Sequence, residues 1–150
     1  MQIFGESEHQ LDDKGRVSVP RRFLSFFNEG GFLTRSFDGE CLVYYSKEAW
    51  EAFLIRIKSI PSTDESADVL YRWLSSGTEV MPDAQGRLTI PPVLRRYANL
   101  TSGISLVARG DKMEVWDTES WQQYLAEKLT TDKVRSALKL MDSREHGITN

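Results

Sequence analysis

Apolar and polar residues alternate strictly in two short segments, 16–20 and 87–91. Alternation of this kind predicts a β-strand that turns one face to a core and the other to solvent. The apolar positions are Val17, Val19, Leu88 and Ile90, and the polar positions are Arg16, Ser18, Arg87 and Thr89. A proline closes each segment and favours a short helix, which we expect at 20–27 and 91–97. The arginine of each strand is therefore predicted to point away from the core.

The two segments belong to an internal duplication. The run Asp12-Asp-Lys-Gly-Arg-Val-Ser-Val-Pro20 returns 71 positions later as Asp83-Ala-Gln-Gly-Arg-Leu-Thr-Ile-Pro91. The same offset aligns Trp50 with Trp121, and we follow it without a gap over nearly 45 residues. Chance similarity rarely keeps one offset over such a length, so the chain is predicted to contain two copies of one unit.

Each copy opens on the same tight turn, Asp-x-x-Gly-Arg. Asp12 and Asp83 can accept hydrogen bonds from the backbone two residues further on, and Gly15 and Gly86 adopt a positive φ at little cost. These four residues are predicted to shape the turn. The turn leads into the strand that carries the arginine.

Copy one then continues with an extended region that turns at Asp38-Gly39. Ser46 is a suitable N-cap for a longer helix, and Ser62-x-x-Glu65 is a capping box that predicts a second helix through 69–74. Copy two repeats this order with extended residues 103–109, a turn at 110–111, an N-cap at Asp117, and helical stripes at 121–129 and 134–141. The sequence thus predicts strands followed by helices in both copies.

The composition is that of an ordinary globular protein, with 40% hydrophobic and 27% charged residues, so we expect a packed core. Cys41 is the only cysteine, which excludes an internal disulfide and a multi-cysteine zinc site and suits a reducing compartment. The first ten residues lack the pattern of a signal peptide, and no apolar run approaches the roughly 20 residues of a membrane span. These features predict a cytoplasmic protein.

The net charge of -3 argues mildly against binding to nucleic acid, because DNA favours proteins that neutralise its phosphates. The first turn is a local exception. Residues 12–22 hold four basic side chains against two acidic ones, namely Lys14, Arg16, Arg21 and Arg22 against Asp12 and Asp13. Any contact with DNA is therefore expected in this region.

The paired turns, each followed by a short strand, a proline and a helix, resemble the signature of the MraZ family, a two-copy member of the AbrB-like swapped-hairpin superfamily. The resemblance runs from Phe4-Gly5-Glu6 through the terminal helix. It implies an α+β fold in which tandem duplicated AbrB-like swapped-hairpin β units form a small β-barrel-like core with flanking α-helices. We expect the first repeat and its helical hairpin at 1–76, the second repeat and the terminal helices at 77–143, and a flexible tail at 144–150.

The resemblance also implies a transcription regulator of the bacterial division and cell wall gene cluster, which acts at its own promoter and binds double-stranded DNA with direct repeats. A ring-shaped homo-oligomer, association with the nucleoid, and the absence of a cofactor, a metal and a membrane partner complete the expectation. The operator sequence, the sign of regulation, the number of subunits and any small-molecule effector are left open. Whether hairpins swap within or between chains is equally undecided, because exchange leaves local sequence signals unchanged.

We expect Arg16 and Arg87 to enter the major groove, where arginine pairs with guanine O6 and N7. Lys14, Arg21 and Arg22 are expected to contact phosphates, which position a protein without carrying sequence information. Copy two departs from this pattern, with Gln85, Pro92 and Val93 at the positions of Lys14, Arg21 and Arg22, unless Arg95 and Arg96 serve instead. Copy one is therefore predicted to contribute more of the affinity.

Purely structural roles can also explain several of these residues. The Asp12–Arg16 and Asp83–Arg87 pairs can be turn-stabilising ion pairs without any ligand. Helical spacing makes Trp50, Trp73 and Trp121 core or subunit contacts rather than base-stacking platforms. His9 and His146 lie too far apart in the sequence to suggest a metal site.

An enzyme and a partner-binding protein are the two alternatives to a DNA-binding protein. An enzyme is disfavoured, because the chain has no Gly-rich phosphate loop, no G-x-S-x-G elbow and no H-E-x-x-H, so we expect no catalytic residues. The second alternative is an antitoxin-like swapped-hairpin protein whose C-terminal segment binds a partner protein. The repetition of helix 64–74 by helix 132–141 favours a scaffold role for that segment instead.

Overall fold

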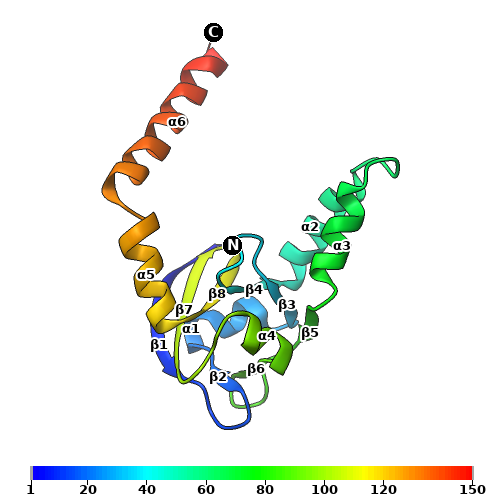
Figure 1. Cartoon of the computed structure of the whole chain (residues 1–150), viewed down its shortest axis with the longest axis vertical. Coiled ribbons are helices and arrows are strands. Elements are labelled where there is room, and N and C mark those ends of the chain that lie inside the picture. Colours follow the sequence, from blue (N-terminus) through cyan, green and yellow to red (C-terminus); the bar gives the residue numbers. More distant parts are fainter. Residues whose placement is uncertain (1, 150) are drawn as a thin grey trace. The chain divides into compact units, whose positions relative to one another are not determined.

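The computed structural model describes residues 2–149, and their side chains up to residue 145. The chain forms two compact units, Met1–Thr118 and Glu119–Asn150, and all strands lie in the first. The strands are β1 (Ile3–Gln10), β2 (Arg16–Ser18), β3 (Gly31–Arg35), β4 (Leu42–Ser46), β5 (Thr78–Val80), β6 (Arg87–Thr89), β7 (Gly103–Gly110) and β8 (Lys112–Asp117) (Figure 1).

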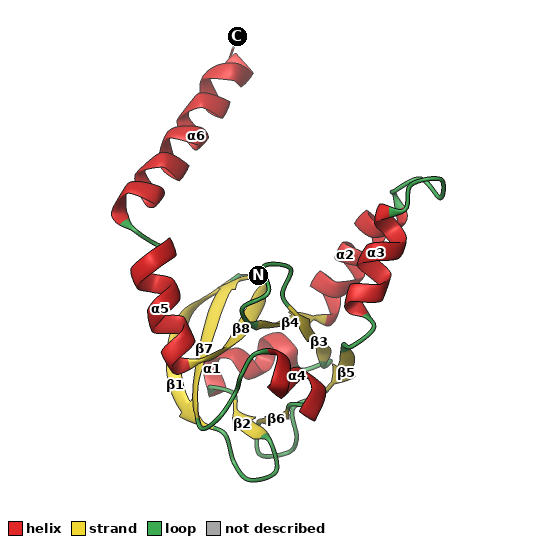
Figure 2. Cartoon of the chain, viewed as in Figure 1, coloured by secondary structure: helices red, strands yellow, loops and turns green. Residues whose placement is uncertain are grey.

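The strands form two antiparallel sheets. Six of them make one sheet in the order β1-β7-β8-β4-β3-β5, and β2 pairs with β6 in a separate two-stranded ladder (Figure 2). The α+β class is confirmed. The expected barrel-like closure is not found among residues 2–149, because β1 and β5 are the edges of an open sheet. The β2–β6 ladder is only three residues long on each side, and the prolines that follow prevent it from extending.

A pseudo-twofold axis relates the two copies. Val17 lies opposite Leu88 in the β2–β6 ladder, and Val43 lies opposite Glu114 in the β4–β8 pair. Each of these residues therefore faces its own counterpart 71 positions away. Only a twofold axis that passes through both pairs produces this register.

The first strand of each copy pairs with the other copy. β1 pairs with β7 along its whole length, and β5 pairs with β3, with Thr78 opposite Leu33. Strand exchange thus takes place within this one chain, a question that the sequence left undecided. Neither copy completes its own sheet without the other.

One expectation about the duplication is wrong, because the offset is not constant. Leu33 lies opposite Tyr44, whereas the residue opposite Val115, the counterpart of Tyr44, is Leu106. β3 and β7 are therefore related by 73 positions rather than 71. Copy one holds its two extra residues in the turn between β3 and β4, which Ser36 closes by donating its backbone N–H to the Cys41 carbonyl at 2.8 Å. Copy two has two extra residues at a different place, between its short helix at 92–97 and β7. The two insertions compensate each other, so the offset is again 71 from β4 and β8 onward.

The main core lies where the inner face of the β2–β6 ladder meets the large sheet and the short helices. The predicted alternation is confirmed, since Val17 and Leu88 are 1% and 0% exposed. The other members include Val19, Phe23, Phe27, Leu33, Leu42, Tyr44, Ile90, Leu94, Ile104, Leu106, Met113 and Val115. Burial of apolar area on this scale is the main stabilising term of such a fold.

Short helices follow the prolines in both copies, as predicted. Copy one has α1 (Arg21–Leu24) and a 3-10 turn, η1 (Ser25–Phe27), and copy two has α4 (Pro92–Tyr97). Pro20 and Pro91 are the N-caps, with extended ψ angles of 139° and 150°. Each proline therefore ends a strand and sets the direction of the helix after it.

A helical hairpin of α2 (Lys47–Lys58) and α3 (Ser66–Leu74) follows copy one. The predicted N-cap is confirmed, because Ser46 Oγ accepts a hydrogen bond from the Ala49 N–H at 3.2 Å. The predicted capping box of Ser62 and Glu65 is wrong. A turn in which the Asp64 N–H donates to the Pro61 carbonyl occupies this segment, so α3 begins at Ser66 instead.

The second unit consists of α5 (Thr118–Lys128) and α6 (Thr131–Thr149), with α5 starting at the unit boundary. Trp121 stacks on Tyr124 within α5, with ring centroids 5.9 Å apart. α6 continues past the last apolar position of its predicted stripe. The flexibility expected for 144–150 stays a prediction, and Asn150 lies outside the described residues.

Candidate nucleic-acid interface

The first turn is organised by one carboxylate. Asp12 Oδ1 accepts hydrogen bonds from the backbone N–H of Lys14 at 2.9 Å and of Arg16 at 2.8 Å. Its Oδ2 accepts from Arg16 Nε at 2.6 Å. Gly15 closes the turn with a φ of +76°, a region that residues with a side chain rarely adopt. The turn-shaping roles predicted for Asp12 and Gly15 match this geometry.

The second turn has the same hydrogen bonds as the first. Asp83 Oδ1 accepts from the backbone N–H of Gln85 and of Arg87, both at 2.9 Å, and Oδ2 accepts from Arg87 Nε at 2.9 Å. Gly86 has a φ of +78°. Two turns of one sequence pattern thus have the same conformation in two places of the fold.

Hydrogen bonds between the copies hold the two turns side by side. The Val19 N–H donates to the Gly86 carbonyl at 2.9 Å, and the Ile90 N–H donates to the Gly15 carbonyl at 2.8 Å. Each turn is therefore fastened to the strand of the other copy. Both turns extend from the end of the first unit where β2 and β6 lie (Figure 1).

Arg16 and Arg87 share the outer face of the β2–β6 ladder. Arg16 lies opposite Thr89 and Arg87 lies opposite Ser18, whereas the buried pair of Val17 and Leu88 points the other way. The side chains of the arginines are 23% and 29% exposed. Their placement on the polar face, predicted from the alternation, is confirmed.

Each arginine is oriented by its aspartate and still keeps donors free. Nε is engaged in the ion pair, and no partner for either pair of Nη amino groups is found in the part of the chain that the structure describes. The Nη groups are the end of the guanidinium that can pair with two acceptors at once. The ion-pair interpretation and the ligand-binding interpretation are therefore compatible in one geometry.

The aspartates stay ionised in this arrangement. The backbone hydrogen bond from Arg16 is the main cause that lowers the pKa of Asp12 below its ordinary value, with smaller contributions from the Arg16 side chain and the Lys14 N–H. The backbone hydrogen bond from Arg87 lowers the pKa of Asp83 in the same way. A charged carboxylate fixes the direction of the guanidinium beside it.

The remaining predicted DNA contacts are not all gathered at the turns. Lys14 is exposed next to the Gly15 bend, within the first turn. Arg21 is exposed on α1, and Arg22 lies over the Phe23 ring at 4.6 Å and beside Gly5 of β1. Among the described residues, no hydrogen bond or ion pair joins the side chain of Arg21 or Arg22 to either turn. Only Lys14 therefore accompanies the turn arginines directly.

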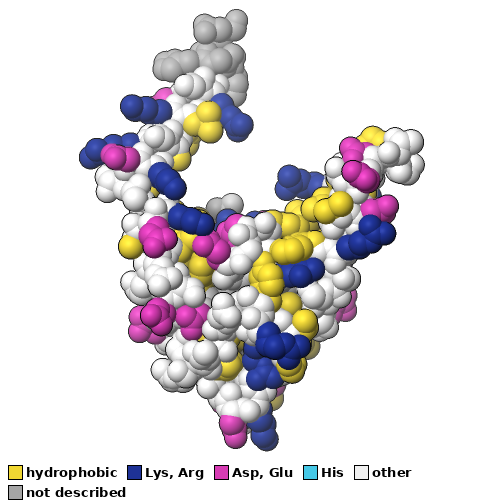
Figure 3. Space-filling view, in the orientation of Figure 1, with side chains coloured by type: hydrophobic (Ala, Val, Ile, Leu, Met, Phe, Trp, Pro, Cys, Tyr) yellow, Lys and Arg dark blue, Asp and Glu magenta, His cyan; other side chains and the backbone are white. Residues whose placement is uncertain are grey.

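One basic residue lies at the first turn although the sequence indicated a different place for it. The Arg95 guanidinium, from α4 of copy two, lies against Gly15, where an added Cβ would stand 2.8 Å from Cζ. From the sequence, Arg95 is expected only as support for the second turn. Lys and Arg side chains gather over the position of α4, and at the lower end of the first unit basic and acidic side chains lie next to each other (Figure 3). The pairing of the two copies gives the first turn this extra cation.

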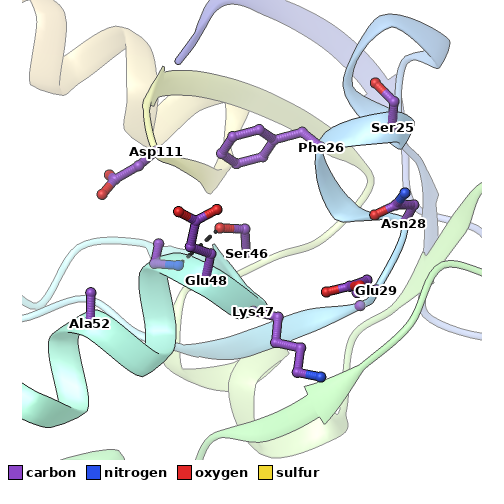
Figure 4. A pocket seen from close by; sticks show the side chains of 11 residues that line it. Ser25, Phe26, Asn28, Glu29, Ser46, Lys47, Glu48, Ala52 and Asp111 are labelled. Carbon is purple, nitrogen blue, oxygen red and sulfur yellow. Dashed lines mark hydrogen bonds between the residues drawn. The ribbon is translucent and has the colours of Figure 1, made fainter. Parts of the chain in front are cut away.

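A separate pocket of about 350 Å³ lies between η1 and the start of α2 (Figure 4). The carboxylates of Glu29, Glu48 and Asp111 line it, with Lys47 as the single basic side chain among its lining residues. A pocket with this excess of negative charge repels phosphate. This pocket is therefore not part of the candidate interface.

The tryptophans of the helical hairpin are packing residues, as expected. Trp50 stacks on Phe32 with ring centroids 3.8 Å apart. Trp73 is covered by the Arg35 guanidinium, 3.8 Å from the ring centroid, and donates from Nε1 to the Ser36 carbonyl at 3.1 Å. Each ring thus has one face covered by a neighbouring side chain, as expected for a packing residue.

No group of three His, Cys, Asp or Glu side chains that could hold a metal ion occurs among the described residues. His9 instead forms a hydrogen bond with Ser7 Oγ at 2.8 Å, and the side chain of His146 lies outside the described ones. Within residues 2–149, the helices are too short or too polar to traverse a lipid bilayer.

In a comparison with known protein families, a match to one family model occurs twice along the chain. The model of the family described as "MraZ protein, putative antitoxin-like" matches residues 3–72 and again residues 74–140. Each matched range contains one of the two Asp-x-x-Gly-Arg turns, and together the ranges cover most of the chain. The chain belongs to the MraZ family.

Proposed function

We propose that this protein is a sequence-specific DNA-binding transcription regulator whose two arginine-bearing turns contact the DNA. The observation that carries the proposal is the pairing of Arg16 and Arg87 on one exposed face, each held by an aspartate and each with free Nη donors. Two such donors match O6 and N7 of guanine in the major groove. The membership in a family of antitoxin-like regulators supports the same function.

The local charge supports this proposal in spite of the net charge of -3. Lys14, Arg16 and Arg95 surround the first turn, whereas the carboxylates of the pocket beside α2 lie on other elements. A field of mixed sign can orient an acidic protein so that its basic end approaches DNA. Asp12 and Asp83 act as positioning residues, because each fixes its arginine before DNA arrives.

A homo-oligomer, expected as a ring, would present several chains to direct repeats in a promoter, including the promoter of the protein's own gene. A pair of turns offers few contacts, and tethering several pairs raises the effective concentration for each further contact. Light scattering tests the assembly, because a particle of several 17.2 kDa chains is expected. A monomer at micromolar concentration would contradict this part of the proposal.

Fluorescence anisotropy tests DNA binding directly, with DNA from upstream of the protein's gene and a scrambled duplex as the comparison. Wild type is expected to prefer the native duplex, and the Arg16→Ala, Arg87→Ala double variant is expected to lose that preference. The matched control is Arg56→Ala, Arg72→Ala, which removes the same charge from two exposed arginines of the helical hairpin and is expected to keep the preference. If the arginine variant is folded and binds like wild type, the DNA-binding face lies elsewhere.

A second candidate function is the binding of a partner protein, as in an antitoxin. The family description favours it, and α6 carries apolar residues that are about half exposed, Val134, Leu138 and Met141, at one helical spacing. An antitoxin forms a stoichiometric complex with its partner. Co-expression with the product of an adjacent gene, followed by size-exclusion chromatography, separates this function from DNA binding.

A further inference from the structure

The two turns of one chain are not equivalent, and the difference comes from helix residues of the opposite copy. Leu24 of copy one and Arg95 of copy two are counterparts, 71 positions apart. Leu24 lies against Gly86 of the second turn, where an added Cβ would stand 3.0 Å from Cδ1, and Arg95 lies against Gly15 of the first turn. One position of the fold thus holds an aliphatic side chain at one turn and a guanidinium at the other.

Arg95 is poorly satisfied where it lies. Its Nε is buried and has no hydrogen-bond partner, and no carboxylate pairs with its guanidinium among the side chains up to residue 145. Removing a charged donor from water without an acceptor is unfavourable. Because no carboxylate neutralises this guanidinium, an anion brought to the open hollow that Arg95 lines would supply the missing negative charge.

The surroundings of Arg95 suit an anion carried by a large molecule. With Lys14 and Arg16 of the same turn, Arg95 gives the first turn three cations against the carboxylates of Asp12 and Asp13. The second turn has Arg87 against Asp83, beside Gln85 and Leu24. An open hollow of about 700 Å³ lies beside Arg95, between α4 and the residues that precede the first turn. Its lining residues are Leu11, Asp12, Pro92, Arg95, Arg96, Asn99, Leu100 and Thr101.

We propose that Arg95 binds a backbone phosphate of DNA and makes the first turn the phosphate anchor of each chain. This inference rests on the proposed function. The second turn then contacts bases through Arg87 with little support from phosphate contacts. The contribution is made across the copies, because the helix of copy two completes the turn of copy one.

The fold supplies a matched pair of variants as the test. Arg95→Leu gives the first turn the residue that the second turn already has, so the fold is expected to be retained, and Leu24→Arg gives the second turn a guanidinium. The slope of log K against log salt falls by about 0.9 for each phosphate contact that is lost on duplex DNA. Arg95→Leu is expected to reduce the slope by about one per bound chain, with the same loss on native and scrambled DNA.

Leu24→Arg is expected to increase the slope. A slope for Arg95→Leu equal to that of wild type, in a variant with an unchanged urea midpoint, would overturn the inference. Arg95→Gln serves as a second variant if the leucine variant unfolds, and it must show the same loss of slope. If inorganic phosphate stabilises wild type against heat but not Arg95→Leu, while both proteins have the same salt slope on DNA, the site binds a free anion and the assignment to DNA is wrong.

The same titrations separate failure of this inference from failure of the proposed function. If wild type prefers native DNA and loses that preference in the Arg16→Ala, Arg87→Ala variant, while Arg95→Leu keeps the full slope, only the phosphate anchor is wrong. If wild type shows no preference for native DNA, the proposed function fails first and the anchor fails with it.

Discussion

Val17 and Leu88 lie opposite each other across the β2–β6 ladder, although 71 positions separate them in the chain, and both are fully buried. Each is the counterpart of the other, so the pseudo-twofold axis passes through the core at this pair. The turns that carry Arg16 and Arg87 are attached to the two strands of this ladder. The geometry of the candidate interface is therefore set by a contact to which both copies contribute.

Truncation of this contact is expected to destabilise both copies together. Leu88→Ala removes a fully buried side chain, which typically lowers the free energy of unfolding by about 2–5 kcal/mol because a cavity remains. Urea denaturation followed by tryptophan fluorescence measures the change, and a single transition is expected. Thr89→Ala, on the exposed face of the same strand, is the control and should change the free energy by less than about 0.5 kcal/mol. Equal midpoints for the two variants would contradict the assignment of faces.

The turn glycines are expected to resist substitution, because the backbone is in the left-handed region and an added Cβ would crowd Arg95 at Gly15 and Leu24 at Gly86. Gly15 and Gly86 have positive φ angles of 76° and 78°, so alanine at either position adopts a left-handed conformation that costs about 1–2 kcal/mol. Gly103→Ala is the control, because its added Cβ meets Thr118 at an ordinary 3.4 Å and no positive φ is required. Thermal denaturation of the three variants checks this. A loss at Gly103 as large as at the turn glycines would rule out backbone strain as the cause.

Local features of the fold were predictable from the sequence, because they depend on neighbouring residues. The turns at Asp12 and Asp83 need only an aspartate and a glycine at the correct spacing, and the burial of Val17 follows from alternation. The N-cap at Ser46 was found for the same reason. In contrast, the capping box predicted at Ser62 is wrong, because a local turn closed by the Asp64 N–H and the Pro61 carbonyl occupies this segment.

Features that depend on pairing between the copies could not be predicted in this way. The two-residue shift between β3 and β7 cancels before the alignment resumes, so sequence comparison does not detect it. The position of Arg95 at Gly15 follows from strand exchange, which a linear sequence does not specify. The sequence does show that Leu24 and Arg95 occupy equivalent positions of the two copies. This difference can be assigned to the two turns only when it is known that each helix lies against the turn of the other copy.

Cys41 is expected to be unreactive in the folded protein. It is 0% exposed, and burial raises the pKa of its thiol, with the charge of Glu114 acting in the same direction. Because the thiolate is the reactive form, a colorimetric thiol reagent at pH 8 should label the native protein very slowly. In denaturing urea one equivalent should react at once, since the chain has a single cysteine. Rapid labelling of the native protein would show that the turn between β3 and β4 opens frequently.

The turn carboxylates predict a dependence of stability on pH in the acidic range. Hydrogen bonds from the backbone lower the folded-state pKa values of Asp12 and Asp83 below the ordinary value of 3.8. For a group whose pKa is depressed by folding, the stabilisation is present above the unfolded value and is lost as pH falls through the folded value. Wild type should therefore lose stability more steeply below pH 3.8 than the Asp12→Asn, Asp83→Asn variant does.

The measurement is a series of urea midpoints from pH 6 downward, in which the difference between wild type and the double variant isolates the two carboxylates from the other acidic groups. The difference should be constant at the upper end and should shrink at the acidic end, because protonated aspartate no longer accepts from the arginine as an ion. A difference that does not change with pH would mean that Asp12 and Asp83 are not ionised partners of Arg16 and Arg87. In that case the arginines would not be fixed in place before DNA binds.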